Sequence, residues 1–472
     1  MNTETKDVFA ILREKFKGDL LRAEDSQYSE ARKIWNAMVA STPGLIARCA
    51  DVSDVQMAVR AAIAADVFTA VRCGGHSLAG FGSCDGLVID LSRMREVSVD
   101  AKSRRARFTG GSLLGTVDRS TQAHGLVFPA GVVSHTGAGG LVLGGGTGWL
   151  ARLFGLSCDN VEAFTMVAAD GSLVHASAGE NEELYWALRG GGGNFGIVTE
   201  FKVRLHPLTS VLLATSYVCG DDIYALLRNW REFMPEAPDA LKWNISLCLA
   251  STKSGVPHEI QGKPAASISL AWFGHPEEGG RIIDRILSKG KHYGGSKKTM
   301  SFLDLQTMAD GDFPHGRRYY TKSGYFPVLD DRTIQIMMEA QASIPSRSTQ
   351  IELAYLGGAV GRVAASETAF GDRSAAFGVN LLADWTDLND DAANVAWVRG
   401  LFGALRPKMK PGVYVNFMSG DEQERVPEAY GERWERIVAV KQHYDPTNFF
   451  RLNQNIQARK PRPTAIEPQS LV

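Results

Sequence analysis

Hydrophobic residues in the first part of the chain recur with two periods, which predict helices alternating with strands. Apolar positions spaced three and four apart between Ser53 and Ala65 predict an amphipathic helix capped by Ser53. The apolar stretch after it predicts a strand that ends at Arg72. Similar patterns predict further strands at 87–91, 105–109 and 197–203 and helices at 113–124 and 182–188. We therefore expect an α+β unit with many glycine turns over residues 1–207.

The pattern changes after Pro207, where alternation with period two prevails. Residues 223–233 carry apolar side chains on one helical face, and 333–342 predict another helix. Alternation predicts strands with one buried face at 243–249, 268–272, 351–355 and 377–383. We expect a second α+β domain over 208–409, an antiparallel sheet covered by helices on one face. A C-terminal segment, 410–460, follows, with a helix around Trp434–Lys441.

Composition narrows the function classes. A chain of 472 residues suggests two or three domains, and a net charge of −1 provides no basic excess for binding nucleic acid. No apolar run reaches the roughly 18 residues of a membrane span, and the charged N-terminal stretch does not resemble a secretory signal. The six cysteines are scattered, which suits a reducing compartment. We expect a soluble cytoplasmic enzyme that binds neither nucleic acid nor membranes.

Two glycine-rich segments carry candidate chemistry. The first, Arg72-Cys73-Gly74-Gly75-His76-Ser77, follows a predicted strand, and such a turn presents backbone N–H groups to an anion. The second, Gly155–Val161, contains Cys158 and comes soon after the glycine run 144–148. Each motif alone is weak evidence for a functional site. The first could be an ordinary glycine turn, and Cys158 could simply be a buried cysteine.

Two other interpretations of these motifs fail on context. Residues 191–196 match G-x-G-x-x-G, but a helical pattern precedes them and a strand follows, the reverse of a nicotinamide-binding fingerprint. Cys73, His76 and Cys84 lack a second pair at zinc-like spacing. We therefore predict no metal site.

Polar faces of predicted strands supply catalytic candidates. In 412–417, period two places Tyr414 and Asn416 on one face and apolar residues on the other. In 318–323, Tyr320 and Lys322 share a face with Arg318, although an exposed lysine is the ordinary alternative for Lys322. A third polar face of this kind carries Asn380, Leu382 and Asp384.

Taken in order, six segments resemble the berberine-bridge-enzyme-like branch of the vanillyl-alcohol-oxidase/p-cresol-methylhydroxylase (VAO/PCMH) flavoproteins. The segments are 72–77, 128–131, 136–140, 155–161, 186–199 and 444–456. The resemblance implies a two-domain fold in which 1–207 bind FAD, 208–409 bind substrate, and 410–460 return to the FAD domain. It also implies bicovalent FAD, because a His of a G-G-H turn and a Cys of a C-x-x-V segment, here His76 and Cys158, both attach to the flavin ring in that branch.

The resemblance assigns further residues to the cofactor. They are Arg72, Cys73, Gly74, Gly75, Ser77, Gly137, Gly139, Gly140, Gly144, Gly145, Gly148, Asn160, Val161, Gly196, Ile197, Val198, Asn453 and Asn455. Val161 is the position that lines the approach of oxygen in the family, where valine accompanies oxidases. The implied reaction is oxidation of a carbon bearing OH or NH, with hydride passing to flavin N5 and O2 becoming H2O2.

The implied substrate is bulky, such as an oligosaccharide or a natural product, and the implied base is Tyr414 of a Y-x-N segment. Lys322 could lower the pKa of Tyr414 or act as the base itself. Tyr320 and Asn416 are the other candidate catalytic residues. Ala365 occupies the position of the catalytic glutamate of plant members, which argues against their cyclising mechanism. Alternatives are a dehydrogenase with another acceptor, an oxidase of aromatic alcohols or cyclic amines, and a flavin-storing protein with little turnover.

Overall fold

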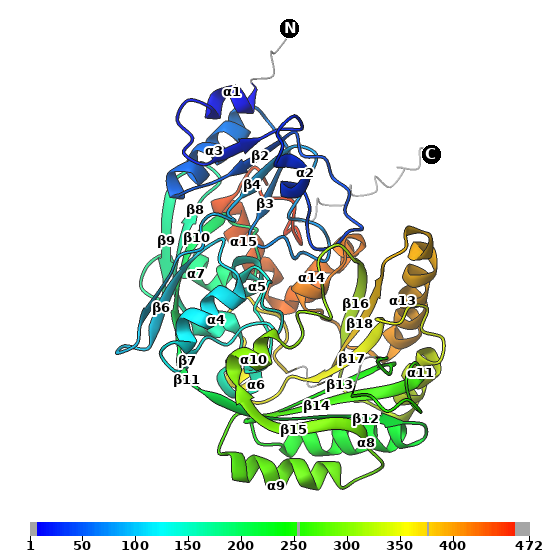
Figure 1. The fold of residues 1–472 in the computed structure, drawn as a ribbon. Helices are drawn as coiled ribbons and strands as arrows, with labels where there is room; N and C mark the ends of the chain where they lie inside the picture. The colour runs from blue at the N-terminus through cyan, green and yellow to red at the C-terminus, as the bar shows by residue number, and fades with distance from the viewer. Residues whose placement is uncertain (1–6, 253–254, 375–376, 458–472) are drawn as a thin grey trace, which may run out of the picture.

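A small parallel sheet occupies the N-terminal end of the molecule, in a computed structural model that describes residues 7–252, 255–374 and 377–457 (Figure 1). Its strand order is β1-β2-β4-β3, with only β1 antiparallel. The strands are β1 (Asp19–Leu21), β2 (Leu45–Arg48), β3 (Thr69–Arg72) and β4 (Leu87–Asp90). Helix α3 (Val52–Ala64) joins β2 to β3, but its cap is Asp51 and not Ser53, because the Asp51 carboxylate accepts from the N–H groups of residues 53 and 54.

A five-stranded antiparallel sheet packs beside it, in the order β5-β6-β10-β8-β9. The strands are β5 (Val97–Asp100), β6 (Arg105–Thr109), β8 (Val161–Val167), β9 (Leu173–Ser177) and β10 (Ile197–Arg204), and the short pair β7 (Leu126–Val127) and β11 (His206–Pro207) lies nearby. The helices of this region are α1 (Val8–Leu12), α2 (Tyr28–Ala31), α4 (Leu114–Gln122), α5 (Ala138–Leu143), α6 (Ala151–Phe154) and α7 (Glu182–Leu188). The strands and helices predicted here are confirmed.

The C-terminal segment joins the core of this first region. Val413, Val415, Ile437 and Ile456 belong to the same buried cluster as residues of β6, β8 and β10. On α15 (Trp434–Tyr444), the buried Lys441 ammonium lies 2.6 Å from the Asp445 carboxylate and donates to the carbonyl of residue 194. Helix α14 (Val426–Tyr430) precedes it. Residues 458–460 of the predicted segment lie outside the described residues.

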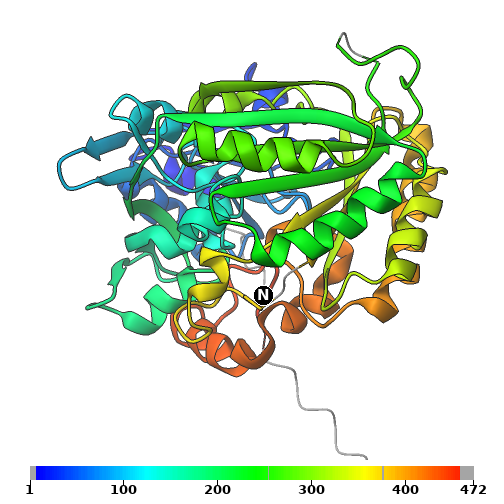
Figure 2. The same cartoon turned by 90° about the horizontal axis from the view of Figure 1, so that it is seen from below.

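A seven-stranded antiparallel sheet forms the other half of the molecule, in the order β15-β12-β14-β13-β17-β18-β16. Its strands are β12 (Ser210–Cys219), β13 (Leu241–Leu249), β14 (Pro264–Trp272), β15 (Tyr293–Ser301), β16 (Arg318–Phe326), β17 (Gln350–Tyr355) and β18 (Phe377–Trp385). Helices α8 (Asp222–Phe233), α9 (Pro276–Leu287), α11 (Asp331–Gln341) and α13 (Asp391–Leu405) cover one face, as Figure 2 shows. The predicted antiparallel sheet with helices on one face is confirmed.

Strand alternation decides which side chains meet the helices. Trp243, Ile245, Ile268 and Leu381 belong to one buried cluster with helix residues such as Trp230. The alternate residues of these strands therefore point to the opposite face, where α10 (Phe302–Thr307) packs on β12. Helix α10 and a second short helix, α12 (Ala359–Arg362), lie in the connections. In the described part of the chain, no helix combines the length and apolar composition that a bilayer crossing needs.

Candidate active site

A cavity of about 370 Å³ lies between the glycine-rich loops and the C-terminal segment. The turn after β3, the loop before α5 and the start of β10 form its walls. The predicted FAD-binding residues that line it are Arg72, Cys73, Gly74, Gly75, His76, Ser77, Gly137, Gly139, Gly140, Gly196, Ile197, Val198 and Asn453. Folding therefore brings segments more than a hundred residues apart into one wall.

The walls of this cavity fit FAD. Two loops approach so closely that a Cβ on Gly74 would lie 2.5 Å from the Gly137 nitrogen, and Gly75 has a φ of 67°. Both positions therefore require glycine. Among the described residues, Nη1 of Arg72 and Oδ1 of Asn453 are buried without a hydrogen-bond partner. Exposed backbone amides and unpaired polar atoms are the groups that phosphates and ribose hydroxyls use.

His76 lies at one end of the cavity inside a group of aromatic rings. Its ring stacks on Trp35, with centroids 4.2 Å apart, and its Nε2 lies 3.0 Å from Nδ1 of His135. His315 joins them, so that one nitrogen of each of the three histidines lies within 4.8 Å of the others. Burial, and then the neighbouring histidines, hold the pKa of His76 well below its usual value. The ring is therefore neutral and nucleophilic.

The three-histidine group was not foreseen from the sequence, because His135 and His315 stand far from His76 along the chain. Three imidazole nitrogens also make a donor set that zinc accepts. The absence of a metal site stays a prediction.

Cys158 lies in a short 3₁₀ turn, η1 (Ser157–Asn160), and its side chain is fully buried. It belongs to an apolar cluster with Phe370 and Tyr414 and lines neither cavity described here. Burial raises the pKa of its thiol well above the ordinary value, and the adjacent Asp159 carboxylate adds to this. The structure therefore brings Cys158 to the side of Tyr414, with its thiol protonated.

The glycines before Cys158 pack against other residues of the site and do not line the 370 Å³ cavity. A Cβ on Gly144 would lie 2.2 Å from Oδ1 of Asn416, and one on Gly145 would lie 2.4 Å from the Phe370 ring. A Cβ on Gly148 would lie 1.8 Å from the carbonyl oxygen of residue 130, and Gly148 lines the second cavity. These glycines make room for the side chains opposite them.

Tyr414 and Asn416 meet as predicted, although the backbone is not the expected strand. Tyr414 precedes a 3₁₀ turn, η5 (Val415–Phe417). The Asn416 Nδ2 donates to the Tyr414 hydroxyl over 2.8 Å, and the Gly146 N–H donates to it over 3.1 Å. Burial raises the pKa of Tyr414 to about 12, while the Asn416 and Gly146 hydrogen bonds act in the opposite direction. Tyr414 lines both cavities.

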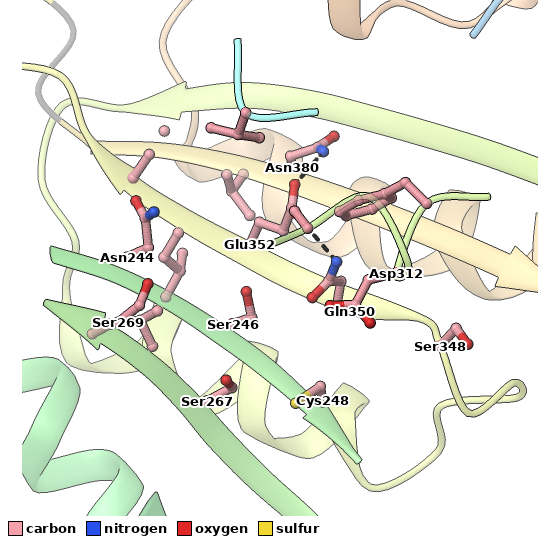
Figure 3. A pocket seen from close by; sticks show the side chains of 18 of the residues that line it. Asn244, Ser246, Cys248, Ser267, Ser269, Asp312, Ser348, Gln350, Glu352 and Asn380 are labelled. Carbon is pink, nitrogen blue, oxygen red and sulfur yellow. Dashed lines mark hydrogen bonds between the residues drawn. The ribbon is translucent and has the colours of Figure 1, made fainter. Parts of the chain in front are cut away.

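A second cavity of about 680 Å³ lies against the face of the large sheet opposite α8, α9, α11 and α13. Alternate residues of β13, β14, β17 and β18 supply a polar floor, shown in Figure 3. The floor residues are Asn244, Ser246, Cys248, Ser267, Ser269, Gln350, Glu352 and Asn380. Hydroxyl, amide and carboxyl groups in this density suit a substrate with several hydrogen-bonding groups.

Glu352 connects the two cavities and was missed in the sequence analysis. Its side chain and that of Asn380 line both of them. Asn380 donates to the Glu352 carboxylate over 2.6 Å and Gln350 donates over 3.2 Å, the two dashed contacts of Figure 3. Burial raises the pKa of Glu352. The signal was present, since Glu352 lies between the apolar residues Ile351 and Leu353 of a correctly predicted strand.

Comparison with known proteins assigns the family. The family model described as FAD binding domain matches residues 43–177, and the model described as berberine and berberine like matches 413–457. The chain is 30% identical over 453 residues to Berberine bridge enzyme-like D-1 of Nicotiana tabacum, covering 82% of this chain and 78% of that protein. The chain belongs to the berberine-bridge-enzyme-like family of FAD-linked oxidoreductases.

Other relatives span nearly the whole of this berberine-bridge-like enzyme. An uncharacterized FAD-linked oxidoreductase of Bacillus subtilis, YgaK, is 32% identical over 450 residues, 94% of this chain and 97% of that protein. The crystal structure of 6-hydroxy-D-nicotine oxidase from Arthrobacter nicotinovorans is 28% identical, covers 94% of this chain and 98% of that one, and superposes with a TM-score of 0.83. The predicted two-domain VAO/PCMH fold is confirmed.

In this berberine-bridge-like enzyme, Tyr320 and Lys322 do not meet Tyr414. They lie on the helix-side face of β16, and neither lines a cavity. The Lys322 ammonium lies 2.9 Å from the Asp421 carboxylate, and the Tyr320 hydroxyl donates to the same residue. Residues of the opposite parity, such as Ser323, line the second cavity. The prediction that Tyr320 and Lys322 face the active site is therefore wrong. Neighbouring residues of a strand point to opposite faces, so the residues of β16 that face the cavity are the ones next to them.

Three further residues assigned to the cofactor lie outside both cavities. Asn160 hydrogen-bonds His206 over 2.7 Å and the carbonyl of residue 156. Val161 begins β8 and is buried in the core of the first region. The Asn455 N–H donates to Gln423 over 3.2 Å. Their roles toward the flavin stay predictions. In the structure, hydrogen bonds hold Asn160 and Asn455 in place, and Val161 is part of the core.

Proposed function

We propose that this enzyme is an oxidase that removes two electrons, as hydride, from an alcohol or amine carbon of a bulky polar substrate and reduces O2 to H2O2. The observation that carries the proposal is Tyr414, which lines both the 370 Å³ cavity and the larger polar one. Bound FAD would supply the hydride acceptor and the reaction with oxygen. The chain's own residues would then bind, orient and deprotonate the substrate.

The cofactor would occupy the smaller cavity, with its phosphates against the glycine loops at Gly74 and Gly137. We propose attachment through both His76 and Cys158. The neutral His76 ring at the cavity supports the first bond. The place of Cys158 beside Tyr414 supports the second, and its protonated thiol must lose a proton before it reacts.

Tyr414 is the proposed base for the O–H or N–H proton of the substrate. Two donors, Asn416 and the Gly146 N–H, point at its oxygen and would stabilise a phenolate there. Glu352 and Asn380, on the floor beside it, would hold the reacting group in place. Lys322 is not part of this proposal, because its ammonium is paired with Asp421.

The substrate would be an oligosaccharide or a natural product with several polar groups. The polar floor of a 680 Å³ cavity supports this class. A relative supports the natural-product part of this class: the (R)-6-hydroxynicotine oxidase of Paenarthrobacter nicotinovorans is 28% identical to this chain over 457 residues. We also propose a reducing, cytoplasmic setting, since all six cysteines are free.

A panel of sugars, benzylic alcohols and cyclic amines would test the proposal. Each compound is added anaerobically to the purified protein, and bleaching of the yellow flavin is followed before air is admitted. Bleaching followed by peroxide supports an oxidase. Bleaching without peroxide indicates a dehydrogenase with another acceptor, and no bleaching by any compound indicates a flavin-binding protein.

A further inference from the structure

A lysine lies on the polar floor of the larger cavity. Lys242 is on β13, on the same face as Asn244 and Ser246, and it lines the cavity. Only 7% of the residue is exposed. A lysine this buried is uncommon unless an anion accompanies it.

Lys242 has no such partner among the residues that the structure describes. Over residues 7–252, 255–374 and 377–457, no hydrogen bond or ion pair reaches its ammonium, and the charge that acts on its pKa is the cation of Arg152. Arg152 is itself buried, and its Nη1 also lacks a partner in this part of the chain. The acidic Asp239 is 4.0 Å from Arg152 but lies 2.5 Å from Arg362.

Two buried cations that repel each other are unfavourable. Burial, and then the Arg152 charge, lower the pKa of Lys242 to about 8, so the amine still carries its proton at neutral pH. A methionine, whose unbranched side chain is one atom shorter, would occupy most of this space without burying a charge. The other cations of the cavity differ, because Arg317 is paired with Asp384 and Arg347 is exposed.

We propose that Lys242 is the binding site for a carboxylate of the substrate, with Arg152 adding positive charge behind it. This rests on the proposed function, since it specifies what the oxidase accepts. Ser246 pairs with Glu352 across the sheet, and Lys242 stands four residues further along β13. That separation corresponds to roughly 13 Å of strand. The substrate would therefore carry its acid group away from the oxidised carbon, as an aromatic acid or a sugar acid does.

Calorimetric titration of the FAD-loaded protein with two matched pairs of probes tests this site. The pairs are 4-hydroxyphenylacetate against 4-hydroxyphenylacetamide, and D-glucuronate against D-glucose. We expect the carboxylate of at least one pair to bind about tenfold or more tighter than its neutral partner. Lys242→Met and Lys242→Gln should each remove that preference, and flavin content and Tm report that they fold. Arg347→Gln, which removes the exposed cation of the same cavity, should keep it.

Three results would overturn the proposal. The first is wild-type protein that binds neither carboxylate, or binds it no tighter than its neutral partner. The second is a preference that survives in whichever Lys242 variant folds, or that disappears in Arg347→Gln. The third is a changed flavin reduction potential in the Lys242 variants with unchanged probe affinity, which would pair the ammonium with the cofactor. Because calorimetry requires no turnover, failure here is distinct from failure of the oxidase proposal.

Discussion

Nε2 of His76 lies 3.0 Å from Nδ1 of His135, so a second histidine engages one nitrogen of the His76 ring. The Trp35 ring stacked on His76 holds the plane of the imidazole. His76 is thus oriented by neighbours on both sides before any cofactor arrives.

Covalent attachment of the flavin is the first expectation. Denatured, precipitated protein should remain yellow, because neither acid nor heat breaks the two bonds. His76→Ala and Cys158→Ala should each retain one bond, and the double variant should release FAD on denaturation. Flavin fluorescence of bands on a denaturing gel measures this, and free FAD from the denatured wild type would contradict it.

The orienting role of His135 gives a second expectation. His135→Ala should slow covalent incorporation of FAD into apoprotein by about tenfold, the usual loss when a histidine loses its orienting partner, while noncovalent FAD binding persists. His315→Ala is the matched control and should have a smaller effect, because no hydrogen bond links it to His76 among the described residues. A chelator should leave incorporation unchanged; if it does not, the three histidines hold a metal.

Tyr414→Phe should bind flavin normally but slow anaerobic flavin reduction by substrate by at least about tenfold, since a positioned base contributes about 10²–10⁴-fold. Lys322→Met is the control, because the Lys322 ammonium is paired with Asp421 on the far face of the sheet. Stopped-flow reduction separates the two. A wild-type rate in Tyr414→Phe together with a slow Lys322→Met would assign the base to Lys322 instead.

The raised pKa of Glu352 predicts a pH effect. A carboxyl whose pKa is raised by burial keeps its proton above its ordinary value of 4.5, so the carboxylate forms only as the pH rises further. If the carboxylate orients the substrate, the flavin reduction rate should rise with pH through this shifted value. Glu352→Gln should be slower and should lack this acid limb. An acid limb that is unchanged in the variant would belong to another group.

Oxygen as acceptor is the fifth expectation. Val161→Leu should slow the reoxidation of photoreduced enzyme by O2, since one added methylene in a close-packed wall fills a small void. Val161 is buried and lines neither cavity, so the flavin spectrum should hardly change. Stopped-flow mixing with aerated buffer measures the rate. Equal rates in the two proteins would remove Val161 from the path of oxygen.

The sequence predicted elements better than it predicted faces. Period-two patterns located the strands carrying Ile351 and Leu381, and local motifs located His76 and Tyr414. Alternation alone does not say which face of β16 meets the helices. The sequence therefore predicts Lys322 as a site residue, whereas in the structure its neighbour Ser323 lines the cavity.

Contacts between distant segments were also out of reach. His135 meets His76 across 59 positions, and Gly146 donates to Tyr414 across 268, contacts that only the folded chain creates. Tyr414 itself lies before a 3₁₀ turn in place of the expected strand, and Asn416 of that turn packs closely against Gly144.

The seven-stranded sheet separates stability from selectivity. Odd-numbered residues of β13, such as Trp243 and Ile245, pack on the helices, while Asn244 and Ser246 face the cavity. Substitutions in the second set change what the floor can bind without altering the packed layer beneath it. Relatives of this chain can therefore diverge in substrate while their helices and strands stay in place, and a library confined to the floor would sample new specificities on an intact scaffold.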